Sequence, residues 1–318
     1  MRVLVTGMGG ELGTRVTNQL EADHRITDIL GVDIDPPRHR IRRADFHRID
    51  PRDRDGLVDL VRDFAPNAVA HLAVYEPNAR SGPKLARRLT HDYAVAALGG
   101  AARGGALDRI VVRSGIEVYG RARGATVRPD EGSVPMPTTP FGRSLLHVEG
   151  IARDAADASG ASLTCLRCAP VVGPHMASPL GRLLRLPVVP VGALSALPFS
   201  LLHLDDAAAA IVRAVECGLD APLNIVGDGA VTARQAALVG GRVPLPIIGP
   251  QWLAARGVTE LLGAPLPAHV RELLVRGGTA EGDRSRELLG ASPKRSTMDV
   301  VQELYEWAAI EHLSAVAA

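Results

Sequence analysis

A glycine-rich segment close to the N-terminus has the residue types and spacing that hold a pyrophosphate. It reads TGMGGELG over residues 6–13, directly after a short run of β-branched residues and directly before a helical pattern. In this spacing, Gly7 makes the tight turn, Gly10 lets the backbone approach the phosphates and Gly13 lets helix and strand pack closely. The N-terminus of the following helix adds unpaired N–H groups and the positive end of its dipole. The segment therefore predicts a dinucleotide site.

An acidic residue completes this pattern about twenty residues further on. Asp33 ends a second apolar run, and its carboxylate is expected to accept hydrogen bonds from the adenosine ribose hydroxyls. A carboxylate at this position repels the 2′-phosphate of NADP, so NAD is the predicted cofactor. Arg38 and Arg40 lie a few residues later and leave NADP open as an alternative.

Strand and helix patterns alternate around and after this segment. Strands are expected at Arg2–Thr6, Ile29–Asp33, Ala68–Leu72, Ile110–Arg113 and Leu163–Ala169, and helices at Leu12–Ala22, Arg54–Ala65, Leu85–Arg103 and Phe141–Ala158. Such alternation is typical of βαβ units. It predicts an α/β fold with a Rossmann-type doubly wound parallel sheet and helices on both faces.

The composition and periodicity of the sequence change after Ala169. Residues 1–169 are expected to form the dinucleotide-binding Rossmann domain. Residues 170–318 are richer in Pro and Gly, which interrupt regular periodicity, and they predict a smaller, loop-rich substrate-side region. Within it, residues 199–226 are expected to return to the Rossmann domain.

Composition narrows the classes of partner. The chain has 36 Lys and Arg against 35 Asp and Glu, a formal net charge of +1, and no dense basic stripe, which argues against nucleic-acid binding. It has no apolar run of about 18 residues or more, and it opens on MRVLVTG rather than on a secretory signal. A cytoplasmic protein without a membrane span is the prediction.

The cysteines do not indicate a metal or a disulfide framework. There are three of them, too few for such a framework in a chain of this size. Cys165 and Cys168 form a CxxC inside an apolar run that reads as a buried strand, where the two side chains are expected on opposite faces. No metal site is therefore predicted.

Sequence motifs along nearly the whole chain match one family. They are the segment at residues 6–13, ID at 49–50, AVAHLA at 68–73, RIVVRSGIEVYG at 109–120, LRCAPVVGP at 166–174, FSLLHLDDAAAAI at 199–211, LNIVGDG at 223–229 and the closing GDRSRELLGASPKRSTMDVVQELYEWA. With these motifs the chain resembles the extended short-chain dehydrogenases/reductases of the NAD-dependent epimerase/dehydratase type, and most closely their UDP-glucose 4-epimerase-like members.

The resemblance implies a cofactor role for each matching position. The pyrophosphate would be held by Gly7, Gly10 and the backbone of Glu11 and Leu12, the ribose by Asp33, the adenine amino group by Asp50, and the inner edge of the cofactor by Leu72 and Ala73. The residue after Asp50 is Pro51. Because proline has no N–H to offer the adenine ring, this departure from the family predicts somewhat weaker adenine binding.

The family's redox residues are missing. Its members transfer hydride with a Ser or Thr that orients the substrate, a Tyr that takes the hydroxyl proton and a Lys that lowers the pKa of the Tyr. The matching positions here are Gly115, Phe141 and Leu145. All three functional groups are therefore absent from the positions at which the family carries them.

Neighbouring polar residues are candidates to replace them. Glu117 matches the position at which nucleotide-sugar dehydratases carry a glutamate base, and Tyr119 lies two residues further on. Ser114, Tyr75 and His147 are on elements expected to flank the same place. Further along the chain, Arg182 or Arg185 could bind a diphosphate.

Two functions remain open from the sequence. The first is an NAD-binding protein with a nucleotide-sugar-like ligand, which is either an atypical oxidoreductase or epimerase or a catalytically silent member of the family. The second is a non-enzymatic NAD(H)-sensing regulatory or assembly protein. Family habit also implies a homodimer that pairs the helices at Leu85–Arg103 and Phe141–Ala158.

Overall fold

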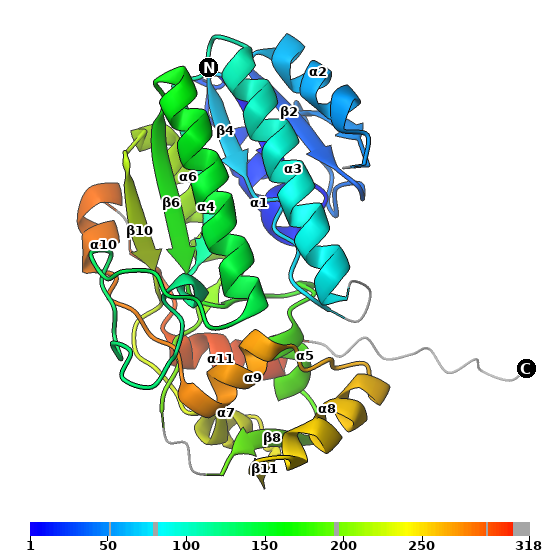
Figure 1. The fold of residues 1–318 in the computed structure, drawn as a ribbon, viewed down its shortest axis with the longest axis vertical. Helices are drawn as coiled ribbons and strands as arrows, with labels where there is room; N and C mark the ends of the chain where they lie inside the picture. Colours follow the sequence, from blue (N-terminus) through cyan, green and yellow to red (C-terminus); the bar gives the residue numbers. More distant parts are fainter. Residues whose placement is uncertain (51, 79–81, 194–196, 291, 308–318) are drawn as a thin grey trace, which may run out of the picture.

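The computed structural model describes residues 1–50, 52–78, 82–193, 197–290 and 292–307. Its centre is a seven-stranded sheet with the order β3-β2-β1-β4-β5-β6-β10, in which every neighbouring pair is parallel (Figure 1). The strands are β1 (Arg2–Thr6), β2 (Asp28–Asp33), β3 (Asp45–Arg48), β4 (Ala68–His71), β5 (Arg109–Gly115), β6 (Ser162–Cys168) and β10 (Ala221–Ile225). The strand order reverses direction between β1 and β4, where a doubly wound sheet leaves a crevice for a ligand.

Helices cover both faces of this sheet (Figure 1). One face carries α1 (Glu11–Leu20) and α6 (Leu204–Cys217), and the other carries α2 (Arg54–Phe64), α3 (Pro83–Arg103) and α4 (Pro140–Ser159). Successive side chains of β1 point to opposite faces of the sheet. Val3 and Val5 therefore pack in the core on the side of α1 and α6, and Leu4 packs in the core on the other side. The predicted fold class is confirmed.

The expected elements agree closely with the observed ones. All five predicted strands and all four predicted helices are present, with ends that differ by no more than about two residues. Cys165 and Cys168 lie in the cores on opposite faces of the sheet, as the strand pattern predicts. β3 was not predicted: its sequence, DFHR, has one apolar residue, and it is a partly exposed edge strand beside β2.

The second half of the chain adds a smaller lobe, below the sheet in Figure 1. The remaining elements are η1 (Ile116–Tyr119), β7 (Val171–Val172), α5 (Pro179–Leu184), β8 (Val188–Gly192), β9 (Leu202–His203), α7 (Ala233–Val239), β11 (Val243–Ile247), α8 (Gln251–Leu261), α9 (Ala268–Arg276), α10 (Asp283–Leu289) and α11 (Thr297–Glu306). The expectation of a loop-rich region is wrong, because short helices pack around their own apolar core, which includes Phe199, Trp252 and Val300. Some of its prolines stand at helix starts, where they are compatible with a helix, as Pro179 does in α5, and others lie in the short strands β8 and β11.

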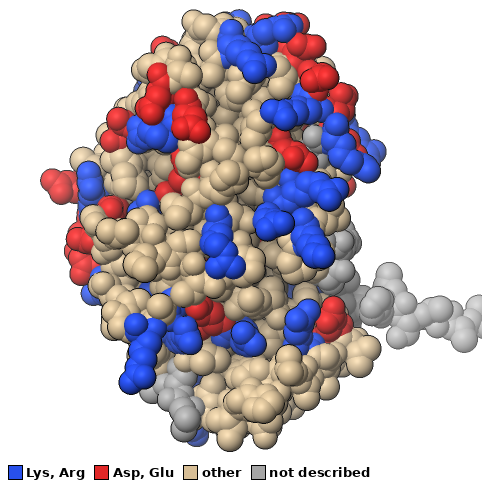
Figure 2. All heavy atoms as spheres, viewed as in Figure 1, with Lys and Arg blue, Asp and Glu red and all other residues tan. Residues whose placement is uncertain are grey.

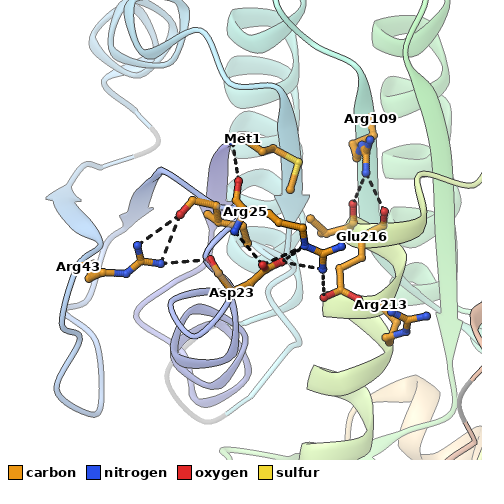
Figure 3. A network of polar contacts seen from close by, with 9 residues as sticks. Met1, Asp23, Arg25, Arg43, Arg109, Arg213 and Glu216 are labelled. Atoms are coloured by element: carbon orange, nitrogen blue, oxygen red, sulfur yellow. Dashed lines mark hydrogen bonds and ion pairs between the residues drawn. The ribbon is translucent and has the colours of Figure 1, made fainter.

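Charged groups fasten the amino ends of the strands to α6 (Figure 3). Arg109 donates to the carbonyls of Val215 and Glu216, 2.9 Å away in each case, near the C-terminus of α6. Arg25 forms ion pairs with Asp23 and with the Glu216 carboxylate, both at 2.9 Å. These contacts lie at the amino ends of the strands, so they fix the scaffold and leave the opposite edge of the sheet for a site.

Charged residues of both signs lie on the face of the molecule drawn in Figure 2. Lys and Arg predominate across the centre of this face, and Asp and Glu lie mainly toward its upper and left edges. In the described parts of the chain, no helix has the length and apolar character needed to cross a membrane.

Candidate functional site

The turn between β1 and α1 is built for close approach. Gly7 has a φ of +74°, which favours glycine, and a Cβ there would lie 2.8 Å from the backbone nitrogen of Ala73. A Cβ on Gly13 would lie 2.0 Å from the carbonyl oxygen of Gly7. At Gly10, by contrast, the nearest atom would be 3.6 Å away. Packing thus requires glycine at positions 7 and 13, while the backbone at Gly10 stays open to a ligand.

The first turn of α1 has backbone N–H groups to offer. Its N-cap is Gly10, which provides no side-chain cap, so the first N–H groups of the helix keep their capacity to bind an anion. The Glu11 side chain points to His39, with 3.0 Å between Oε2 and Nε2. The Leu12 side chain is buried in the core. Glu11 and Leu12 therefore offer a ligand their backbone.

Asp33 stands beside this turn at the end of β2. Its Oδ2 accepts from the N–H of Gly9 at 2.8 Å and its Oδ1 from the N–H of Ile34 at 2.6 Å. The Tyr75 hydroxyl donates to Oδ1 at 3.4 Å. Burial raises the pKa of the Asp33 carboxyl, and the backbone hydrogen bonds oppose that change. The carboxylate is fixed in place and keeps lone pairs for a ribose.

Asp50 follows β3 next to Asp33. The N–H of Ile49 donates to the carbonyl of Asp33 at 3.0 Å, which joins the two strand ends. The Asp50 carboxylate is paired with Arg52, whose hydrogen bonds lower its pKa to about 2. Pro51 lies outside the described residues. Asp50 is thus near enough to serve the adenine end of a cofactor, although Arg52 already binds it.

These residues fit a dinucleotide. The open backbone at Gly10, the first turn of α1 and the acceptor Asp33 meet at the crevice between β1 and β4, with Leu72 and Ala73 packed against Gly7. A pyrophosphate and an adenosine ribose need this set of groups. NAD would be held here by the residues expected from the sequence.

A pocket adjoins the carboxyl ends of β5 and β6. Its lining comes from these strands and from η1, α4, α5 and α9: Glu76, Arg113, Ser114, Gly115, Ile116, Glu117, Arg121, Phe141, Leu145, Cys168, Ala169, Pro170, Val171, Ser178, Leu180, His269, Val270, Glu272, Leu273 and Gly277. Gly115, Phe141 and Leu145, the positions at which the resemblance expects the family's redox groups, all line this pocket. The ionisable groups of the pocket come from other positions, namely Glu76, Arg113, Glu117, Arg121, His269 and Glu272.

Glu117 fills the space that a side chain at position 115 needs. A Cβ on Gly115 would lie 2.2 Å from Oε2 of Glu117 and 3.1 Å from Cδ1 of Leu145. Gly115 has an extended backbone, with φ of −151° and ψ of 157°, which any residue adopts. Space rather than backbone strain therefore explains the glycine, because the Glu117 carboxylate lies too close to residue 115 for a Cβ.

The surroundings of Glu117 favour its protonated form. Burial is the main cause that raises the pKa of this carboxyl, and the nearby Glu76 adds to the rise. His269 and Arg113 act in the opposite direction. Apart from the backbone N–H of Glu117 itself, no group of the described residues donates a hydrogen bond to the Glu117 carboxyl. A carboxyl with a raised pKa in a pocket is a candidate acid-base group.

Tyr119 and Ser114 are engaged in a buried network instead. The Tyr119 hydroxyl donates to Oδ1 of Asn224 at 2.8 Å and accepts from Nη1 of Arg167 at 3.1 Å. Arg167 also forms an ion pair with Glu149 at 2.7 Å, and Ser114 donates to the same carboxylate at 2.6 Å. Tyr119 does not line the pocket. Its hydroxyl therefore fixes the packing of η1 against β6 and β10.

The remaining candidates lie apart from the pocket. His147 is exposed on α4 and pairs with His91 of α3, with 3.0 Å between ring nitrogens. The guanidinium groups of Arg182 and Arg185 bind backbone carbonyls at 3.5 and 3.0 Å. In the described part of the chain, no group of three or more His, Cys, Asp or Glu could hold a metal ion.

The sequence did not indicate that Glu76 and His269 line the pocket. Glu76 follows β4 and His269 is the second residue of α9, and their side chains meet at 2.8 Å. They are 193 residues apart in the chain. No motif marks either one, so only the fold brings them together.

The fold and the site together define a dinucleotide-binding α/β protein of the extended type. The model of the NAD dependent epimerase/dehydratase family matches residues 3–225. The chain belongs to this family, whose cofactor is NAD.

Similar proteins include an uncharacterized protein and three UDP-glucose 4-epimerases. An uncharacterized protein of Mycobacterium tuberculosis is 29% identical over 95% of this chain and 83% of its own length. UDP-glucose 4-epimerase of Azospirillum brasilense is 33% identical over 57% of this chain and 51% of its own. The UDP-glucose 4-epimerase of Thermotoga maritima, solved with UDP-glucose, has a TM-score of 0.73 at 21% identity, over 96% of this chain and 98% of its own. The Brucella ovis enzyme of the same name, solved with NAD, has a TM-score of 0.72 at 20% identity, over 95% and 96%.

Proposed function

We propose that this protein binds NAD at the turn between β1 and α1 and a nucleotide-sugar-like ligand in the adjacent pocket, as an atypical oxidoreductase or epimerase that uses Glu117 for acid-base chemistry. The observation that carries the proposal is the carboxylate of Glu117 in the space beside Gly115. The site keeps its binding groups and replaces its chemical ones. The UDP-glucose 4-epimerases among its relatives support the class of ligand.

Each group of the chain has a separate task in this proposal. The turn at Gly10 holds the phosphates and Asp33 the ribose. Bound NAD supplies a hydride acceptor. Glu117 donates a hydrogen bond to the reacting hydroxyl of the sugar, and its raised pKa favours the protonated form that donates. Tyr119 belongs to the supporting network in this account and not to the reacting groups.

Calorimetric titration with NAD⁺, NADH and NADP⁺ tests the cofactor part. We expect micromolar binding of NAD⁺ and weaker binding of NADP⁺, because Asp33 repels the 2′-phosphate. The Glu117→Gln variant is expected to bind NAD⁺ as the wild type does and to lose turnover of UDP-glucose or UDP-galactose. Ordinary epimerase rates in both Glu117→Gln and Tyr119→Phe would contradict the rearranged site.

A second candidate is a non-enzymatic NAD(H) sensor or assembly protein. It is favoured by the apolar, buried side chains of Phe141 and Leu145 in the place of the family's redox groups. In this case cofactor occupancy would set the conformation of the smaller lobe and thereby a partner contact. A partner captured by the NAD-loaded protein and not by the apo form is the expected result, and identical captures in both states would exclude this function.

We further propose a cytoplasmic homodimer that pairs α3 and α4 of two copies. The exposed His91 and His147 stack on each other between these two helices, with ring centroids 5.1 Å apart, and would lie at such an interface. Sedimentation equilibrium tests it: a mass of twice the 33.5 kDa chain is expected, and a monomer at all concentrations would contradict it.

A further inference from the structure

A histidine from the smaller lobe lines the same pocket as Glu117. His269 lies in the first turn of α9 and is 7% exposed. Its ring packs on Phe141, with the two centroids 4.5 Å apart and the planes inclined by 35°. The imidazole thus stands against the aromatic ring at one of the positions where the family's redox groups are missing.

The carboxylate of Glu76 orients this imidazole. Oε1 of Glu76 is 2.8 Å from Nε2 of His269. A carboxylate only accepts, so Nε2 carries the proton, and Nδ1 of the neutral ring is left as an acceptor with a free lone pair. Among the described residues, none makes a hydrogen bond to Nδ1. A base whose second nitrogen is held by a carboxylate is the arrangement in which histidine acts as an acid-base group.

We propose that His269 is an acid-base residue of this pocket and that Glu76 is its positioning residue. This inference rests on the proposed function, because it assigns the group that takes the hydroxyl proton of the ligand. Glu117 and His269 then act on one ligand from η1 and from α9. The other charged groups that face the pocket are Arg113, Arg121 and Glu272.

The proton balance of the step is simple. The O–H bond of a ligand hydroxyl breaks, its proton forms a bond to Nδ1 of His269, and the imidazolium is balanced by the Glu76 carboxylate. The carbon that bears this oxygen would give up a hydride to bound NAD, which is the oxidant of the proposed function. In the reverse direction Nδ1 returns the proton to the oxygen. Glu117 in its protonated form donates a hydrogen bond to the ligand and steadies the oxygen.

The first test measures the tautomer of His269. Histidine-selective ¹⁵N labelling of the full chain, with His269→Gln to assign the resonances, is expected to show protonated Nε2 and unprotonated Nδ1. The Glu76→Gln variant is expected to lose this preference, because an amide accepts or donates equally well. Saturation with UDP-glucose in the presence of NAD⁺ is expected to shift the Nδ1 resonance. A protonated Nδ1 in the neutral ring, or an Nδ1 resonance that saturating ligand leaves unchanged, would overturn the proposal.

The second test separates chemistry from folding. We expect His269→Gln to lower kcat for UDP-glucose by about 10²- to 10⁴-fold with KM for the sugar changed far less. Glu76→Gln is expected to lower kcat by a smaller factor. Affinity for NAD⁺, measured by calorimetry, should stay at the wild-type value in both, which also shows that they fold. The control is His24→Gln, an exposed histidine outside the pocket, expected to have wild-type kcat.

The outcomes distinguish this inference from the proposed function. Wild-type protein that binds NAD⁺ but neither binds nor turns over UDP-sugars would overturn both. Wild-type turnover that His269→Gln leaves at full rate would overturn the acid-base role of His269 alone. Loss of kcat in His269→Gln, with the tautomer preference abolished in Glu76→Gln, is the result that supports the pair.

Discussion

Gly115 and Glu117 are linked by space, and the Gly115→Ala substitution tests the link. The new Cβ would lie 2.2 Å from Oε2 of Glu117, whereas ordinary contacts begin near 3.4 Å. The carboxylate must therefore retreat by about 1 Å. It is the far end of a flexible side chain that lines a pocket, so the retreat costs no more than about 0.5–1.5 kcal/mol of rotamer energy. Replacing a glycine reduces the conformational entropy of the unfolded chain, which stabilises the folded protein by about 0.4–1 kcal/mol.

The expected result is a nearly unchanged fold with an impaired site. The free energy of unfolding in urea should differ from the wild-type value by less than about 1 kcal/mol, since the two contributions oppose each other. Turnover should fall by about 10²-fold, because a misplacement of about 1 Å at a reacting group has that effect. The pKa of the Glu117 carboxyl should also move from its raised value, as measured by ¹³C titration with Glu117→Gln for assignment.

A matched control and a double variant complete the test. Gly257→Ala places a methyl group on an exposed position of α8 with no atom within 4 Å, and it should leave turnover unchanged. In the double variant Gly115→Ala/Glu117→Gln, the loss should be no greater than in Glu117→Gln alone. The same Glu117 pKa and the same kcat in Gly115→Ala and in wild type would refute the reasoning, because the carboxylate would not occupy the space beside Gly115.

Three further predictions concern stability and cofactor binding. Burial lowers the pKa of His71 from 6.5 to about 4, so below pH 6.5 the unfolded chain binds a proton that the folded chain does not. Urea unfolding should therefore show that this group costs about 3 kcal/mol of stability between pH 6.5 and 4. An equal pH dependence in His71→Gln would contradict this. Asp33→Ala should weaken NAD⁺ binding by about 10- to 100-fold in calorimetry, since charge-assisted hydrogen bonds to the ribose are lost; wild-type affinity would exclude Asp33 from the site. Tyr119→Phe should lower the free energy of unfolding by about 1–3 kcal/mol, because Arg167 and Asn224 lose a buried partner, with kcat unchanged; a large loss of kcat at unchanged stability would return Tyr119 to the reacting groups.

The Rossmann half of the fold could be predicted from local pattern. Gly7, Gly10 and Gly13 stand at fixed spacing between a strand and a helix, so the sequence marks them without knowledge of the rest of the fold, although the contact that requires glycine at position 7 is with Leu72 and Ala73 after β4. The same holds for Asp33, which lies at the end of the next strand. Local periodicity failed at β3, where DFHR has too few apolar residues to mark an edge strand.

The pocket could be predicted only in part. The resemblance led to Gly115, Phe141, Leu145 and the candidate Glu117, and all four line the pocket. The contact between Glu76 and His269 spans 193 residues, so it depends on how the smaller lobe packs on the sheet. No spacing or composition in the sequence carries that information.

The most direct test of the central claim follows the near-ultraviolet absorbance of bound NADH. NAD-loaded wild-type protein is mixed with UDP-glucose or UDP-galactose, with Glu117→Gln and the exposed-site variant His24→Gln in parallel. A rise in NADH absorbance in wild type and His24→Gln, and none in Glu117→Gln, is the predicted result. A protein that holds NAD⁺ and shows no NADH with either sugar would contradict the account, and an equal rise in Glu117→Gln would remove Glu117 from it.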